Sequence, residues 1–104
     1  MSLFGKRMKE ARLRAGLSQE RLGVLAGIDE MSSSARMNQY ERGKHEPDFS
    51  LVERVAQILD VPECYFYCKD DDVAFVLVQL HQVPAGQKQE MISEIRRVLA
   101  DRSA

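Results

Sequence analysis

A run of polar side chains between residues 33 and 44 offers hydrogen-bond donors and acceptors rather than a catalytic set. Asn38 and Gln39 carry amides and Arg36 carries a guanidinium. These groups form paired hydrogen bonds with the edges of nucleic-acid bases. Taken alone, the same residues are more often simply the solvated face of a helix. The elements that position them therefore decide the interpretation.

Few other residues suggest reactive chemistry. Cys64 and Cys68 lie one helical turn apart, and a zinc site would need a second pair of ligands at a recognisable spacing. His45 and His81 stand at no such spacing, and neighbouring cysteines on one helix rarely meet disulfide geometry. The chain also lacks a nucleophile elbow and a phosphate-binding loop. We expect no enzyme activity, no metal and no cofactor, with idle or buried thiols.

Charge is divided unequally along the 104 residues, although the whole chain carries only −1. Residues 1–48 hold nine basic and seven acidic side chains, a net +2, whereas residues 49–104 hold six and nine, a net −3. The basic half is thus the better candidate for contact with a polyanion. No stretch approaches the roughly 20 apolar residues of a membrane span, and no leader opens the chain. We expect a cytoplasmic protein with no membrane partner.

Helical spacing of apolar residues recurs throughout, and strand alternation is nearly absent, which predicts an all-α fold. Ser18 is expected to cap the second helix and Asp48 the fourth, with a capping box at Ser50–Glu53 as the alternative start of the fourth. Pro62 suits the first turn of a short helix. The expected helices span about 3–15, 19–26, 33–42, 49–59, 62–67, 73–82 and 87–101.

The apolar positions also predict which face of each helix is apolar and available for packing. In the second helix, Leu22, Leu25 and Ala26 are expected to point inward, and Met37 and Tyr40 do so in the third. In the sixth helix the expected stripe contains Val73, Val76, Leu77 and Leu80, widened by Phe75 and Val78. The last helix carries Met91, Ile92, Ile95, Val98 and Leu99 on one face.

Two stretches carry a family resemblance: GLSQERLGVLAGI (residues 16–28) and RMNQYERGKHEPDFSLVERVAQILDVP (residues 36–62). Leu-Ser-Gln opens the second helix and a glycine ends it, Tyr-Glu-Arg-Gly closes the third, and a proline precedes the fourth. With these marks in order, residues 3–67 resemble the Cro/C1-type (XRE-like, lambda-repressor-like) helix-turn-helix family of phage repressors and related bacterial regulators. The resemblance implies a transcriptional regulator that binds double-stranded DNA.

The resemblance also implies roles for single residues. Residues 1–68 would form a five-helix lambda-repressor-like DNA-binding domain, followed by two C-terminal helices in residues 69–104. Ser34, Ala35 and Gln39 match base-reading positions; chemistry adds Arg36 and Asn38, which are expected to be exposed on the same helix. Arg12 and Glu41 match a structural ion pair. The matches to DNA-backbone positions are Gln19, Ser33, Arg42 and Lys44.

Two departures from the family pattern concern the second and third helices. Gly23 stands where alanine is usual, and a small residue there still permits close packing at a helix cost of about 1 kcal/mol. The connection around Asp29–Ser32 is a few residues longer than usual. We expect the longer connection either to shift the third helix, which is the recognition helix of the family, or to add an early turn to it, with Met31 folding onto the core.

The C-terminal helices have two interpretations. Operators are usually read by dimers, so the apolar faces within residues 70–102 favour a homodimer that reads a pseudo-palindromic operator. The alternative is that these helices merely cap the core of a monomer. A different function also stays open: an antitoxin, or an adaptor that acts mainly through a protein partner.

Overall fold

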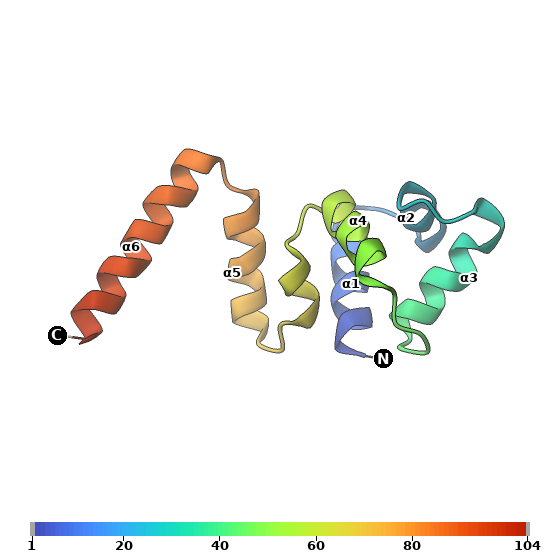
Figure 1. Cartoon of the computed structure of the whole chain (residues 1–104), viewed down its shortest axis with the longest axis horizontal. Helices are drawn as coiled ribbons and strands as arrows, with labels where there is room; N and C mark the ends of the chain where they lie inside the picture. The colour runs from blue at the N-terminus through green and yellow to red at the C-terminus, as the bar shows by residue number, and fades with distance from the viewer. Residues whose placement is uncertain (1, 104) are drawn as a thin grey trace.

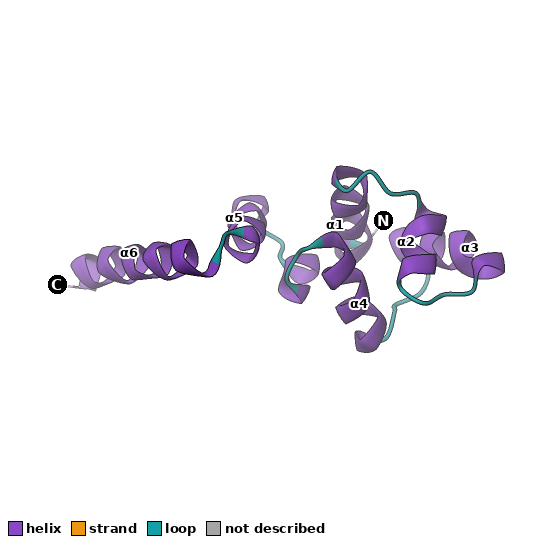
Figure 2. Ribbon diagram, turned by 90° about the horizontal axis from the view of Figure 1, so that it is seen from above, coloured by secondary structure: helices purple, strands orange, loops and turns teal. Residues whose placement is uncertain are grey.

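The computed structural model describes residues 2–103, and within them the chain is helical without any strand (Figure 2). Six α-helices and one 3₁₀-helix, η1, follow each other along the chain. This confirms the predicted all-α class. The elements are α1 (Leu3–Arg14), α2 (Gln19–Leu25), α3 (Glu30–Glu41), α4 (Phe49–Leu59), η1 (Glu63–Tyr67), α5 (Asp71–Gln82) and α6 (Ala85–Ser103).

The hydrophobic core lies among α1, α2, α3, α4 and η1, with one edge of α5 added to it. In Figure 1, α1 and α4 occupy the middle, α2 and α3 lie on one side, and η1 followed by α5 lies on the other. Met8, Leu22, Met37 and Val52 are at most 1% exposed. Burying a side chain of this size contributes about 1.5–3 kcal/mol, so these contacts hold the helices in place.

Short polar side chains set where the helices begin. Ser18 accepts a hydrogen bond from the Arg21 amide, and Asp48 accepts one from the Leu51 amide at 2.8 Å. Both predicted caps are confirmed, and the alternative start at a capping box is wrong because Asp48 already satisfies the first turn of α4. After α1 and α2 the backbone turns at Gly16 (φ 71°) and Gly27 (φ 94°), a region that glycine enters without strain.

The third helix begins earlier than expected. It starts at Glu30 rather than near Ser33, with Asp29 as its N-cap, so the longer connection adds an early helical turn. Met31 is 92% exposed on that turn and does not fold onto the core, contrary to expectation. Leu25 is likewise 46% exposed, because Leu22 and Ala26 fill the inward face of α2.

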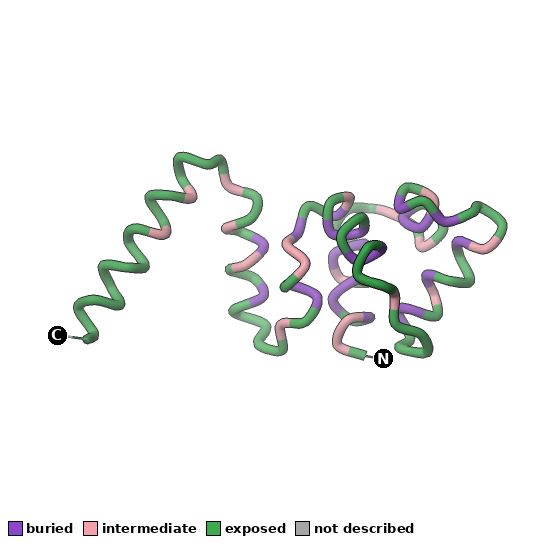
Figure 3. The backbone as a smooth tube through the Cα atoms, viewed as in Figure 1, coloured by how far each residue is buried: buried purple, intermediate pink, exposed green. Residues whose placement is uncertain are grey.

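Helix α5 contacts the core along one edge, and part of its predicted apolar stripe stays exposed. Ala74 and Val78 are buried, whereas Val73 and Val76 are 50% and 45% exposed. The rotation of α5 is set by the contacts that Arg7 makes with the Cys68 carbonyl and with Asp71 at the start of the helix. Helix α6 then leaves α5 at an angle and has no buried residue (Figures 1 and 3). The molecule is therefore elongated, measuring 57 × 26 × 22 Å.

Candidate nucleic-acid interface

Helices α2 and α3 approach each other closely because residue 23 has no side chain. A Cβ added at Gly23 would lie 2.0 Å from the Ser33 hydroxyl oxygen and 2.8 Å from Cγ of Met37. That hydroxyl instead donates to the Glu20 carbonyl at 2.8 Å. Ser33 is 0% exposed, so the expectation that it faces solvent and contacts the DNA backbone is wrong. The extra turn of α3 places it inside the pair.

A buried network of hydrogen bonds connects α2 and α3 to α1. The predicted ion pair is confirmed: Arg12 Nε donates to Glu41 Oε2 at 2.7 Å, and Arg12 Nη2 donates to Glu41 Oε1 at 3.2 Å. Arg12 Nη1 donates to the Leu17 carbonyl at 2.8 Å. The Gln19 amide donates to Glu41 Oε1 at 3.1 Å and to Asn38 Oδ1 at 3.3 Å. Because every partner is satisfied, the network links α1, α2 and α3 rigidly.

The outward face of α3 presents a row of side chains. Ala35, Gln39 and Arg42 are all exposed and recur at four- and three-residue intervals, which places them along one stripe of the helix. Ser34 is exposed beside this stripe, and Asn38 is half-buried because its amide oxygen faces Gln19. The structure thus brings four predicted base-reading residues to one surface.

Arg36 lies on the flank of α3 rather than in this row. Its guanidinium donates to the Tyr40 hydroxyl at 3.0 Å and lies 6.0 Å from the centre of the Tyr40 ring. In this position Arg36 lies beside the row of Ala35, Gln39 and Arg42 rather than within it. Arg42 and Lys44 are exposed at the C-terminal end of α3, where the Lys44 amide donates to the Gln39 carbonyl. Two cations therefore lie at the C-terminal end of the row, one within it and one just beyond it.

Sequence reasoning missed one buried cation, Arg7, which attaches α5 to the domain. Arg7 is 3% exposed and donates to the Cys68 carbonyl from Nε at 3.0 Å and from Nη2 at 2.8 Å. It also pairs with Asp71 at 2.9 Å, in the first turn of α5. Burial alone would lower the pKa of Arg7, but Asp71 and Glu10 hold it above its ordinary value. Position 7 follows Phe4 by three residues and precedes Ala11 by four. This helical spacing alone predicts that Arg7 lies on the buried face of α1.

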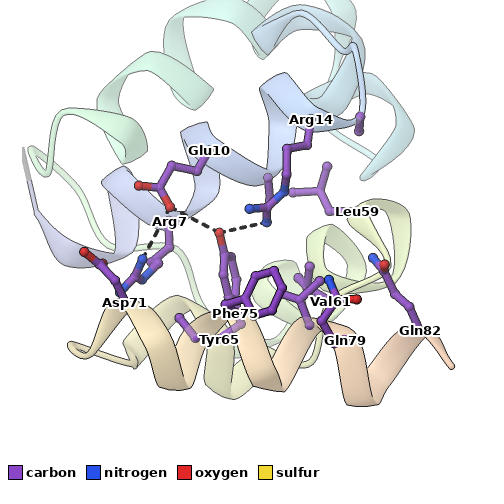
Figure 4. A pocket seen from close by; sticks show the side chains of 14 residues that line it. Arg7, Glu10, Arg14, Leu59, Val61, Tyr65, Asp71, Phe75, Gln79 and Gln82 are labelled. Atoms are coloured by element: carbon purple, nitrogen blue, oxygen red, sulfur yellow. Dashed lines mark hydrogen bonds and ion pairs between the residues drawn. The ribbon is translucent and has the colours of Figure 1, made fainter.

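Tyr65 of η1 lies beside Arg7 in a cleft of about 560 Å³ between α1 and α5 (Figure 4). Its hydroxyl accepts a hydrogen bond from Arg14 at 2.9 Å and lies 3.4 Å from Glu10 Oε2. Burial raises the pKa of Tyr65, against the opposing effect of Arg14. The residues that line this cleft lie in or next to α1, η1, α5 and the end of α4, and none of them belongs to α3. Its contacts support the fold rather than the polar row on α3.

The thiols of the two cysteines belong neither to the polar row on α3 nor to the contacts around Tyr65 in the cleft. Cys64 is exposed and Cys68 is half-buried, and both are free. Among residues 2–103, no group of three or more histidine, cysteine or carboxylate side chains has a geometry that would hold a metal ion. No helix in that range is long and apolar enough to cross a membrane.

Comparison with known proteins gives the same assignment for the N-terminal part of the chain. A family model described as a helix-turn-helix domain matches residues 3–64. Uncharacterized HTH-type transcriptional regulators of Sinorhizobium medicae and Rhizobium meliloti are each 33% identical over 63 residues, 61% of this chain and 42% of theirs. The SPbeta prophage-derived uncharacterized HTH-type transcriptional regulator YonR of Bacillus subtilis is 36% identical over 59 residues, 57% of this chain and 51% of YonR. The chain therefore spans about half or less of these curated relatives.

A solved structure extends the similarity to the C-terminal helices. The crystal structure of the transcriptional regulator BswR superposes with a TM-score of 0.88 at 44% identity, covering 93% of this chain and 96% of that one. The family model covers more than half of the chain, and the BswR match includes α5 and most of the remaining length. The chain belongs to the helix-turn-helix family of XRE-like, lambda-repressor-like regulators.

Proposed function

We propose that this protein is a sequence-specific DNA-binding regulator that reads the major groove with α3. The observation that carries the proposal is the exposed row of Ala35, Gln39 and Arg42 on a helix braced from behind by a buried ion pair. A helix-turn-helix places the N-terminal part of its second helix in the major groove. A rigid brace holds the reading groups in position before DNA arrives, which lowers the entropy lost on binding.

The exposed side chains around α3 are of two kinds: readers, which contact base edges, and anchors, which contact phosphates. Gln39 and Asn38 offer amides suited to adenine, Ser34 offers a hydroxyl, and Ala35 offers a methyl group for thymine. Arg36 stands at the edge, where it reaches a guanine or a phosphate after leaving Tyr40. Arg42 and Lys44 anchor phosphates. Gln19 does so through its backbone amide at the start of α2, where the helix N-terminus favours an anion, because its side-chain amide donates to Asn38 and Glu41. Ser33 is not among the anchors because it is buried.

We further propose that the C-terminal helices form a homodimer, so that two copies of α3 meet a pseudo-palindromic operator. Helix α6 has 19 residues and none of them is buried. In proteins most of the stability of a helix comes from packing of its apolar face rather than from the propensities of its residues. A second copy supplies that packing. The exposed apolar side chains on the two helices are Val73, Phe75, Val76, Met91, Ile95, Val98 and Leu99.

The test is a selection of random duplex DNA by the purified protein, with the mass of the complex measured at the same salt. We expect a palindromic motif whose half-sites lie about 10 base pairs apart, bound by a dimer. No enriched sequence, together with binding that vanishes at physiological salt, would contradict the proposal. That outcome would favour an antitoxin or adaptor acting through a protein partner.

Variants separate the readers from the anchors. Gln39→Ala is expected to change base preference at one position in each half-site. Lys44→Ala should weaken all sequences alike and reduce the salt slope by about one. Arg97→Ala, on α6, removes the same charge far from α3 and serves as the control. Equal, sequence-independent losses from Gln39→Ala and Lys44→Ala would show that the division is wrong.

A further inference from the structure

The added first turn of α3 carries an apolar side chain that nothing covers within residues 2–103. Met31 is 92% exposed, more than any other large hydrophobic residue described as exposed. It lies at the α3 end of the long molecule, whereas the apolar faces of α5 and α6 lie toward the other end (Figure 1). Dimerisation through α5 and α6 would therefore leave Met31 in solvent.

Met31 continues the row that faces outward on α3. It precedes Ala35 by four residues and Gln39 by eight, so the three side chains share one stripe of the helix. At 1.5 Å per residue, Met31 lies about 6 Å beyond Ala35 along the helix axis. That distance is nearly two base-pair steps of about 3.4 Å. Met31 is thus placed to reach a base outside the set read by Ala35 and Gln39.

We propose that Met31 reads the C5-methyl group of a thymine in the major groove, at the end of the operator half-site that the start of α3 faces. The inference rests on the proposed function, because it requires α3 to enter the groove. A thioether side chain has no hydrogen-bond donor and accepts only weakly. The thymine methyl is the apolar group that the major groove offers. Met31 is flexible and polarizable, which suits it to a contact of this shape.

The neighbouring charges favour the groove floor over the phosphate ridge. Asp29 stands at the N-cap position of α3 and Glu30 occupies its first turn, so two carboxylates precede Met31. Phosphates would repel these carboxylates, and residues 30–33 include no basic side chain. The start of α3 therefore offers no anchor for a phosphate, and its most exposed apolar group is Met31. The extra turn therefore adds to sequence specificity rather than to general affinity for DNA.

The test replaces each thymine of the selected operator by deoxyuridine, which keeps the hydrogen-bonding edge and lacks the methyl group. For the unaltered protein we expect about a fourfold loss of affinity for each methyl group removed, at a position outside those that respond to Gln39→Ala. In Met31→Ala the same replacement should cost nothing further. Replacing that thymine by 5-methylcytosine should retain the advantage over cytosine in the unaltered protein alone.

Two variants control the comparison. Gln39→Ala, which leaves Met31 in place, should keep the full sensitivity to the missing methyl. Met31→Leu, which stays apolar, should retain most of it. Met31 is exposed, so its variants should melt at the temperature of the unaltered protein, and circular dichroism checks this.

Failure of this inference is distinguishable from failure of the proposed function. If an operator is selected and responds to Gln39→Ala, but no thymine methyl depends on Met31, the proposed role of Met31 is wrong and the regulator function stands. An operator without thymine at the outer position has the same meaning. If no sequence is selected at all, both proposals fall.

Discussion

At the scale of single residues, the stability of the reading surface depends on a charge pair that is buried and fully bonded. Arg12 and Glu41 are 8% and 2% exposed and lie 2.7 Å apart at their closest atoms. Removing one partner leaves the other charge without compensation in a poorly solvated site. Removing one partner should therefore lower the free energy of unfolding strongly. Replacing both partners by apolar residues should change it much less.

Glu41→Gln is expected to lower the free energy of unfolding by about 3–5 kcal/mol, because Arg12 loses its counter-charge. The double variant Arg12→Met with Glu41→Leu should recover most of that loss. Urea denaturation measures both. Glu94→Gln removes a carboxylate from the exposed pair with Arg97 and should leave the midpoint unchanged. A double variant as unstable as the single one would contradict this account.

The contact between Gly23 and Ser33 makes a second prediction at this scale. Gly23→Ala should destabilise the domain by about 1–3 kcal/mol through overpacking, although alanine is the better helix former. Ser33→Ala in the same chain removes the oxygen that lies 2.0 Å from the added Cβ, and leaves Cγ of Met37 at 2.8 Å and Cβ of residue 33 at 3.2 Å. Thermal melting should show that the pair is less destabilised than the sum of the single variants. Additive losses would mean that α2 and α3 separate freely.

At the scale of elements, Arg7 joins α5 to the DNA-binding domain. Its guanidinium reaches the Cys68 carbonyl just before α5 and the Asp71 carboxylate in the first turn. Asp70 caps the helix by accepting from the amides of Asp72 and Val73. These contacts fix both the start and the rotation of α5, which explains why Ala74 and Val78 face inward.

Arg7→Met should loosen α5 without unfolding the core. Hydrogen bonds to a charged group contribute about 1.5–3 kcal/mol, so protection of the α5 amides from hydrogen exchange should fall roughly tenfold or more. Amides of α2 and α4 should keep their protection. Lys6→Met is the matched control, because Lys6 is exposed and only approaches Asp71 at 3.8 Å. Equal effects from the two variants would show that Arg7 is not the attachment point.

At the scale of the whole molecule, the elongated shape separates the reading helix from the proposed dimer surface. Helix α3 lies at one end and α6 at the other (Figure 1). On α6, Met91, Ile95, Val98 and Leu99 are 38–51% exposed on one face. Arg97 pairs with Glu94 and Asp101 on the neighbouring side of the helix. This division is typical of a helix that packs against a partner on one side only.

Ile95→Glu should convert the proposed dimer to monomer, because association would bury an unpaired carboxylate. Sedimentation equilibrium should show a dissociation constant at least about tenfold higher, equivalent to 1.4 kcal/mol. Ser93→Glu adds the same charge away from the apolar face and should leave the mass unchanged. If both variants remain dimers, the dimer surface lies elsewhere.

Much of the fold was predictable from the sequence because its signals are local. The caps at Ser18 and Asp48 and the stop at Gly16 depend on hydrogen bonds within one turn, so a few consecutive residues determine them. The family pattern indicated the partnership of Arg12 with Glu41. The buried residues of α4 include Val52, Val55, Ala56 and Leu59, whose helical spacing places them on one face.

Only the tertiary structure decided which way α5 turns, where α3 starts and what surrounds Ser33 and Arg7. Two faces of α5 are apolar, and the choice between them depends on Arg7, more than 60 residues away in the chain. Helix α3 starts at Glu30, and Ser33 then lies within the helix, buried against Gly23. Sequence by itself thus determined the helices and the family, because local hydrogen bonds and periodicity encode them. The reading surface and the faces left open depend on contacts between distant residues, which a linear pattern does not contain.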